Sequence, residues 1–298
     1  MDKGIIRVEG ISWSYDGVRG ISDVSVEIRR GEILGIIGPN GSGKTTLLRC
    51  LAGLLKPHGA IYIDGRNLSR INARELARIL SYIPSEYEGQ PSLTVYEVVS
   101  AGRTPHMRGV WWESGEDEAI IWESMSVMGV DEMAERRVGE LSSGEKQKVR
   151  LARALAQQPK IILVDEPTSH LDPRNQIEIM KVLRLMTLKG ASVIAVLHDL
   201  NLASLYSDRI LVLKDGRVVA CGKPSEILDE KLLREVFEID VRILFDSRLG
   251  RPFIIPLPGK EILGTRAMER MDGAKELPCV KDSGSSTGGA AKQGKDNR

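Results

Sequence analysis

The chain has 298 residues, long enough for one large or two modest domains with a substantial core. Its 42 basic and 41 acidic side chains nearly cancel to a net charge of +1, so the charge balance excludes a broad electrostatic attraction to nucleic acid. Three widely separated cysteines predict reduced intracellular thiols, and because no apolar run approaches the roughly 20 residues of a membrane span, we expect membrane contact only through a partner.

Strands and helices alternate along the chain, which is the pattern of a parallel-sheet α/β core. The run GEILGIIG (31–38) predicts a buried strand that leads into a helix at TTLLRCLAGLL (45–55). Other strands are expected at residues 5–12, 23–30, 59–68, 160–167, 191–199 and 208–222, and other helices at 94–102, 116–130 and 142–156. Residues 260–298 are rich in Gly, Ser and Lys and bury too little apolar surface to fold, so we expect a disordered tail.

The stretch GPNGSGKTT joins the predicted strand to its helix and carries the full GxxxxGK[ST] pattern of a phosphate-binding P-loop. Its glycines let successive N–H groups point into one concavity, Lys44 brings a positive charge to the β- and γ-phosphates, and the Thr45 hydroxyl can ligate Mg²⁺. The expected nucleotide-binding residues are Gly38, Pro39, Asn40, Gly41, Ser42, Gly43, Lys44, Thr45 and Thr46. By itself this loop leaves kinases, GTPases, helicases and transport ATPases open.

A second phosphate-site element is IILVDEP, in which an apolar strand ends at an acidic pair. Asp165 at the strand end can reach Mg²⁺, and Glu166 can act as the general base that activates a water molecule. An acidic pair of this kind can also be a solvated turn, but the P-loop upstream favours the functional interpretation.

The segment LSSGEKQKVRLARALAQQPK predicts a helix that is N-capped by Ser142 and runs to Ala156. Its Gly-containing start can present N–H and hydroxyl groups to a phosphate, like a second P-loop. A single bound nucleotide does not need two such phosphate-binding elements from one chain. Two chains arranged head to tail would use both elements, because each chain would cap the nucleotide bound by the other. Here the sequence resembles the ATP-binding subunit of ABC transporters, whose signature reads LSGGQ, over nearly all of residues 4–258.

This resemblance implies the ABC ATPase fold: a P-loop NTPase core with a mostly parallel sheet, an antiparallel β subdomain and a helical subdomain. It implies an ATP-binding domain at residues 1–258, with the helical subdomain at about 86–158 and a short C-terminal extension at about 231–258, before the tail at 259–298. Trp111 and Trp112 lie in the predicted helical subdomain, where a core position is favoured over an exposed contact for both.

The resemblance also assigns roles to single residues. It implies that Tyr15 stacks on adenine and that His198, in VLHDLN, contacts the γ-phosphate beside the catalytic base Glu166. Across a dimer seam, the nucleotide of a second copy would be met by Ser142, Ser143, Gly144, Glu145 and, in SHLD, Asp172.

The sequence departs from the family pattern at three positions. Ser143 replaces the usual Gly of the signature, and Glu145 replaces Gln, a common variation. Ser85 stands where the family has a Gln whose amide touches Mg²⁺ or the attacking water and senses the membrane subunit. A serine hydroxyl is shorter, so we expect it to reach the metal only through a bridging water, with Glu86 and Gln90 as candidates to compensate.

Shorter motifs point to one branch of the family. AGRTPH (101–106), HDLNLA (198–203) and LLREVFEIDVRILFDSRLGRPFIIP resemble importer subunits for iron–siderophore, haem, cobalamin and related metal chelates. Importers of oxyanions such as molybdate or tungstate are close relatives and stay open as an alternative. A soluble ABC-type ATPase of DNA repair or translation is a less favoured one, because the chain has neither a long coiled coil nor a second cassette.

The sequence therefore predicts an ATPase that uses Mg²⁺ and ATP and pairs with a second copy of itself around two ATP molecules. Its other expected partners are membrane permease subunits and, indirectly, a solute-binding protein, with no nucleic acid. The expected location is the cytoplasmic face of the cell membrane, as a peripheral subunit.

Overall fold

The computed structural model describes residues 4–15, 17–85, 91–107 and 115–258. The chain divides into two units, Met1–Leu257 and Pro258–Arg298, and all that follows concerns the first. Trp111, Trp112, Glu86, Gln90 and the predicted tail at 259–298 lie outside the described residues.

The central element is a six-stranded sheet with the order β10-β9-β3-β8-β7-β6. Its strands are β3 (Ile33–Ile37), β6 (Leu80–Ile83), β7 (Ile161–Asp165), β8 (Ser192–Val196), β9 (Arg209–Lys214) and β10 (Arg217–Gly222). All neighbours are parallel except β9 and β10, which form a hairpin. The inner strands β3, β7 and β8 are buried at every residue, as expected for parallel strands covered on both faces.

Two smaller antiparallel sheets accompany it. A four-stranded sheet has the order β2-β1-β4-β5, and a two-stranded hairpin lies at the C-terminal end of the described chain. The strands are β1 (Ile6–Tyr15), β2 (Val18–Ile28), β4 (His58–Ile63), β5 (Arg66–Asn67), β11 (Val241–Asp246) and β12 (Arg251–Pro256). The predicted boundary at residue 23 was wrong, because β2 begins at Val18, directly after a turn at Gly17 with φ 84°.

Helices fill the connections between strands. They are α1 (Lys44–Leu51), α2 (Ala73–Ile79), α3 (Val95–Ser100), α4 (Gly115–Met128), α5 (Ser143–Ala156), α6 (Pro173–Leu188), α7 (Leu200–Tyr206), α8 (Pro224–Ile227) and α9 (Glu230–Phe237). The predicted cap of α5 is confirmed: the Ser142 hydroxyl accepts from the Glu145 N–H, and the Glu145 carboxylate accepts from the Ser142 N–H.

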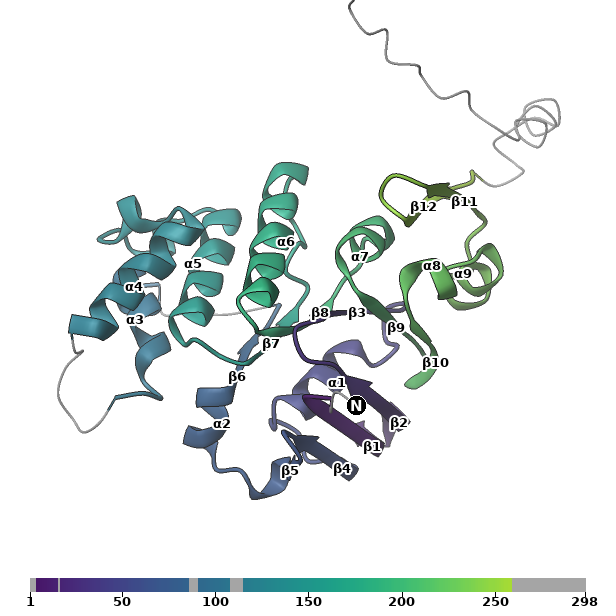
Figure 1. Cartoon of the computed structure of the whole chain (residues 1–298), viewed down its shortest axis with the longest axis horizontal. Coiled ribbons are helices and arrows are strands. Elements are labelled where there is room, and N and C mark those ends of the chain that lie inside the picture. The colour runs from purple at the N-terminus through teal and green to yellow at the C-terminus, as the bar shows by residue number, and fades with distance from the viewer. Residues whose placement is uncertain (1–3, 16, 86–90, 108–114, 259–298) are drawn as a thin grey trace, which may run out of the picture. The chain divides into compact units, whose positions relative to one another are not determined.

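Alternating side chains of the central sheet feed two separate cores. On β3, Ile33 and Ile37 pack with α5, α6 and α7, whereas Leu34 and Ile36 pack with α1 and the antiparallel sheet. In Figure 1, α6 and α7 accordingly lie on one side of the sheet and α1 on the other. The fold class predicted from the sequence is confirmed, whereas the division into domains stays a prediction.

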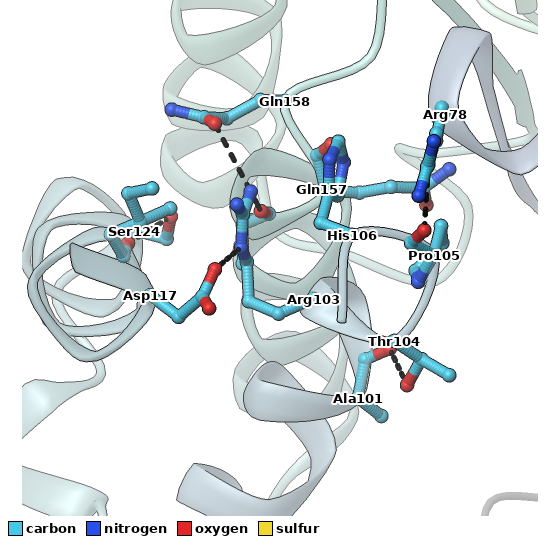
Figure 2. A network of polar contacts seen from close by, with 12 residues as sticks. Arg78, Ala101, Arg103, Thr104, Pro105, His106, Asp117, Ser124, Gln157 and Gln158 are labelled. Atoms are coloured by element: carbon cyan, nitrogen blue, oxygen red, sulfur yellow. Dashed lines mark hydrogen bonds and ion pairs between the residues drawn. The ribbon is translucent and has the colours of Figure 1, made fainter. Parts of the chain in front are cut away.

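The helical segment α3–α5 contains a buried arginine from the AGRTPH motif (Figure 2). Arg103 lies on a short 3₁₀ helix and is only 6% exposed. Its guanidinium pairs with Asp117 of α4 at 2.7 Å and donates to the Ala156 carbonyl at 2.8 Å and to the Gln158 side chain at 3.0 Å. One side chain thus joins α4 to the end of α5.

Residues of the AGRTPH motif are also connected to α2 and to β6, the last strand in the order of the central sheet. Arg78 of α2 donates to the Pro105 carbonyl at 2.7 Å, and the His106 ring lies 2.9 Å from the Gln157 carbonyl. Gln157 in turn donates to the Leu80 carbonyl at 2.8 Å. These bonds connect the helical segment to α2 and β6.

Candidate functional site

The predicted P-loop follows β3 and wraps the start of α1. Gly43 occupies the N-cap position with φ 95°, and a Cβ there would lie 2.3 Å from the Gly20 carbonyl oxygen. A Cβ on Gly38 would lie 2.2 Å from the Leu213 carbonyl oxygen. Only glycine fits at both positions, so the loop can fold closely against its neighbours and direct its N–H groups toward one centre.

Lys44 is buried at the centre of this loop, with 6% of its surface exposed. Its ammonium group donates to the carbonyls of Gly38 and Pro39, each at 2.9 Å. Burial lowers the pKa of Lys44, while the charges of Glu166 and Asp165 act in the opposite direction. The positive charge of Lys44 therefore interacts electrostatically with both acidic residues that end and follow β7.

Asp165 is the most deeply buried acidic residue of this group, at 1% exposure. Neither of its carboxylate oxygens has a hydrogen-bond partner among the described residues. Burial raises its pKa and the Glu166 charge adds to the rise, whereas the neighbouring Thr45 hydroxyl opposes it. A buried pair of acceptor oxygens beside a hydroxyl is a donor set that suits Mg²⁺, so Asp165 and Thr45 fit the metal that the sequence implied.

Glu166 is held between two donors. His198 Nε2 lies 2.6 Å from its Oε1, and the Ser169 hydroxyl donates to its Oε2 at 3.0 Å. Burial works to raise the pKa of Glu166, but the bonds from His198 and Ser169 outweigh it and hold the pKa below its usual value. The carboxylate is therefore ionised at neutral pH, as a general base must be.

Glu166 also has an unusual backbone conformation, with φ 51°. The left-handed region costs a non-glycine residue roughly 1–2 kcal/mol. The surrounding contacts maintain this strained geometry, which is typical of functional positions.

The strand order explains why these residues meet. The carboxyl ends of β3, β8, β7 and β6 lie side by side at one edge of the sheet, since these strands are parallel neighbours. The P-loop follows β3, His198 follows β8, and Asp165 and Glu166 lie at the end of β7. Ligand sites of open parallel sheets occur at this edge.

Ser85 follows β6 at the same edge but makes no side-chain hydrogen bond among the described residues. Its side chain is exposed, and its carbonyl accepts from the Arg150 guanidinium of α5 at 3.3 Å. The structure therefore joins Ser85 to the helical segment through its backbone, and its predicted role at the metal stays a prediction.

Tyr15 lies at the end of β1 and is 40% exposed. Its ring meets the Trp13 ring edge to face, with 6.1 Å between centroids. An accessible aromatic ring at the rim of the β subdomain suits stacking on a base, which stays a prediction.

The residues assigned to the partner's nucleotide gather elsewhere on the chain. A Cβ on Gly144 at the start of α5 would lie 3.7 Å from Leu171 and from the Asn175 amide. Asp172 is the N-cap of α6 and accepts from the Asn175 N–H at 3.0 Å. The signature and Asp172 thus form one cluster, and within the described residues no hydrogen bond joins Ser142, Ser143, Gly144 or Glu145 to the P-loop.

Sequence reasoning missed Ser169, although it lies in the same TSHLD stretch as Asp172. It also missed that Arg103 is buried and that Asn201 of HDLNLA bonds to β12, because a motif does not name its long-range partners. Across the described residues no group of three or more His, Cys, Asp or Glu side chains could hold a metal ion. None of the described helices is long and apolar enough to cross a membrane.

Residues 21–169 match the family model described as ABC transporter. The chain is 39% identical over 267 residues to the hemin import ATP-binding protein HmuV of Gloeobacter violaceus, covering 87% of this chain and 96% of that protein. It is 39% identical over 253 residues to the petrobactin import ATP-binding protein FpuD of Bacillus anthracis, covering 84% and 93%. It is also 39% identical over 259 residues to the uncharacterized ABC transporter ATP-binding protein YvrA of Bacillus subtilis, covering 86% of this chain but only 59% of that protein.

Solved structures agree with these matches. A chain from a metal-chelate type ABC transporter in an inward-facing conformation superposes with a TM-score of 0.75 at 25% identity, over 88% of this chain and all of that one. The dimeric ABC transporter cassette MJ0796 superposes with a TM-score of 0.67 at 33% identity, over 73% of this chain and 98% of that one.

Proposed function

The chain belongs to the ABC transporter family as an ATP-binding subunit, and from this membership we propose that it hydrolyses ATP to drive import of a metal chelate through a separate membrane permease. The observation that carries the proposal is the meeting of Lys44, Asp165, Glu166 and His198 at one edge of the central sheet. The groups that bind phosphate and the base that activates water lie within reach of one another there.

The P-loop binds ATP in this proposal. Its N–H groups and the start of α1 surround the phosphates, and the Lys44 ammonium exchanges the carbonyls of Gly38 and Pro39 for β- and γ-phosphate oxygens. Tyr15 supplies a face for adenine. Positioning and charge account for most of the catalysis of phosphoryl transfer. The fixed position of the P-loop therefore contributes more than covalent chemistry does.

Glu166 takes the proton from the attacking water, and ATP and water become ADP and phosphate. Its lowered pKa keeps it ionised for this step. His198 orients the carboxylate through their 2.6 Å contact, and in this proposal it also contacts the γ-phosphate. The bond from Ser169 fixes the second carboxylate oxygen, which leaves the base with one orientation.

Thr45 and Asp165 would hold Mg²⁺, which supplies positive charge to the phosphates when bound. Ser85 would take part only through water, as its short side chain requires. Both assignments rest on the donor set at the sheet edge.

Dimerisation completes the site. Cassettes of this family form dimers, as the MJ0796 structure does, and the separate cluster of Ser142, Ser143, Gly144, Glu145 and Asp172 supports a head-to-tail pair. Each chain would then cover the ATP bound by its partner. As a transporter subunit the pair would lie on the cytoplasmic face of the membrane and bind permease subunits, with a solute-binding protein delivering the cargo to them.

The cargo is proposed from the relatives. They include ATP-binding proteins for the import of hemin, petrobactin and iron(3+)-hydroxamate and for the transport of achromobactin. These names favour a metal chelate over molybdate or tungstate, and they do not favour a soluble role in DNA repair or translation.

Reconstitution with the cognate permease and binding protein in proteoliposomes tests the proposal. Wild-type protein should drive ATP-dependent uptake of a ⁵⁵Fe–siderophore, hemin or cobalamin. Glu166→Gln should still bind ATP and form a stable dimer on gel filtration, but it should neither hydrolyse ATP nor support uptake. Glu178→Gln, which removes a partly exposed carboxylate paired with Arg174 of α6 and Lys148 of α5, is the matched control and should behave as wild type. Wild-type hydrolysis by Glu166→Gln, or uptake of molybdate alone, would contradict the proposal.

A further inference from the structure

The C-terminal hairpin lies directly against the short helix that follows His198 (Figure 1). Three residues of this stretch, spaced by three positions, bond to β12: Asn201 and Ser204 through their side chains, and Ser207 through its backbone carbonyl. The Ser204 hydroxyl donates to the Pro252 carbonyl at 2.6 Å, and the Arg251 guanidinium donates to the Ser207 carbonyl at 2.7 Å. Strand β12 therefore contacts α7 along its whole length.

The contact nearest to His198 is reciprocal. The Asn201 amide nitrogen donates to the Ile254 carbonyl at 3.0 Å, and the Asn201 amide oxygen accepts from the Ile254 N–H at 2.8 Å. Ile254 is 3% exposed, so both of its backbone groups are satisfied by this one side chain at a buried position. An amide that bonds both groups of a strand residue acts like a neighbouring strand and fixes both distance and direction.

Only three residues separate strand β8 of the central sheet from α7. Leu197 is still bonded to β3, through its N–H to the Ile36 carbonyl at 3.0 Å, and α7 begins at Leu200 after its N-cap Asp199. His198 lies in this short connection. Because the sheet side is fixed, the position of the first turn of α7 decides where the imidazole points.

The two ends of α7 are held by different parts of the molecule. Beyond its C-terminal end, Asp208 accepts from the Ile33 N–H at 2.7 Å and pairs with Arg184 of α6 at 2.9 Å, so this end is tied to the core. The N-terminal end is tied through Asn201 to the hairpin. A helix of seven residues has little stability of its own, so these attachments determine its place.

We infer that Asn201 is a positioning residue for ATP hydrolysis: through Ile254, the C-terminal hairpin holds the His198 imidazole against Glu166. The inference rests on the proposed function of His198. It makes turnover depend on a hairpin that packs against α7, α8 and α9, and it assigns the C-terminal extension a task at the catalytic site.

Asn201→Ala is a clean test, because the cap of α7 uses the Asn201 backbone N–H, which the substitution keeps. We expect kcat for ATP to fall by roughly tenfold with KM unchanged, since the P-loop binds ATP independently of α7. The Asp side chain in Asn201→Asp can accept from the Ile254 N–H but cannot donate to the Ile254 carbonyl. The kcat of this variant should therefore lie between those of wild type and Asn201→Ala. Ser204→Ala removes a bond to the same strand one turn further from His198 and should keep the wild-type kcat at a temperature at which it is folded.

A His198→Ala background separates positioning from general loss of structure. There Asn201→Ala should reduce kcat no further, because the group that it positions is gone. The histidine-ring NMR spectrum of the four histidines should change at His198 in Asn201→Ala and stay the same at His58, His106 and His170.

Three results would overturn the inference. The first is an Asn201→Ala kcat equal to that of wild type while the kcat of His198→Ala is reduced. A full further loss in the His198→Ala background would show that Asn201 acts by another route. An unchanged kcat in His198→Ala itself would overturn the proposed role of His198, and this inference with it.

Discussion

At the scale of single residues, the site depends on contacts that neighbouring sequence positions do not reveal. Local patterns predicted Lys44, Asp165 and Glu166, because P-loops and strand-end acidic pairs are written in adjacent residues, whereas His198 was implied by the family resemblance. The 2.6 Å contact between His198 and Glu166 has no such pattern, since it arises only when β7 and β8 become neighbours. The positive φ of Glu166 could not be predicted from the sequence either, because backbone strain is maintained by tertiary contacts.

Substitution of Ser85 tests whether the length of the side chain at this position matters for coupling to the permease. We expect Ser85→Gln to leave basal ATP hydrolysis unchanged but to raise its stimulation by a reconstituted permease and binding protein. The longer amide can contact the metal site directly, and one oriented contact is worth about 1–2 kcal/mol, roughly a tenfold effect on a coupled step. Stimulated ATPase rate and transport per ATP in matched proteoliposomes are the measurements.

Two further variants make this test specific. Gln90→Ala removes a side chain that could substitute for the missing amide. Ser225→Gln makes the same chemical change at an exposed position on α8 and should have no effect. Equal stimulation in Ser85 and Ser85→Gln proteins would mean that this side chain does not carry coupling.

At the scale of elements, local signals predicted boundaries well where a cap is present. Helix α5 begins after Ser142 and ends at Ala156 as predicted, because its capping box and its periodicity are both written in adjacent residues. Helix α2 and strand β6 were not predicted. They are short, and β6 is defined by its pairing with β7, which is a long-range contact.

Arg103 shows how one side chain can hold an element in place. Arg103→Met should lower the free energy of unfolding by about 3–5 kcal/mol, because it removes the guanidinium donor from the partly buried Asp117 carboxylate and from the buried Ala156 carbonyl. Arg103→Lys should lower the free energy of unfolding by a smaller amount, since an ammonium keeps the charge but cannot span the same three acceptors. Urea unfolding followed by circular dichroism measures both.

The matched comparison is Arg174→Met. That side chain is 87% exposed and pairs with Glu178 on the surface of α6, so its loss should change stability by at most about 1 kcal/mol. If the two methionine variants unfold at the same urea concentration, the Arg103 contacts do not hold the helical segment together.

At the scale of the whole molecule, the sequence predicted the layers but not their order. Alternating strands and helices indicate a parallel sheet with both faces covered, and the two cores on either face of β3 bear this out. The order β10-β9-β3-β8-β7-β6 follows from pairings between distant segments, so no local pattern contains it. That order is what brings the cis residues together and leaves the signature apart.

Mixing two inactive variants tests the division between cis and trans residues. Ser142→Arg should abolish hydrolysis while ATP still binds, and Lys44→Ala should abolish binding at its own P-loop. In a mixed pair, one seam keeps an intact Lys44 and an intact Ser142, so partial activity should return. Phosphate release from the mixture measures it, and silent heterodimers that are shown to form would argue against action in trans.

The distance between the two clusters also has a kinetic meaning. If each chain covers the ATP of its partner, as proposed, a single chain carries two unlike halves and no complete active site. Below the dissociation constant of the dimer, hydrolysis is then second order in protein and grows with the square of its concentration. A permease that binds two chains side by side converts this into a first-order process, so assembly alone would switch the enzyme on in the place where its work is used.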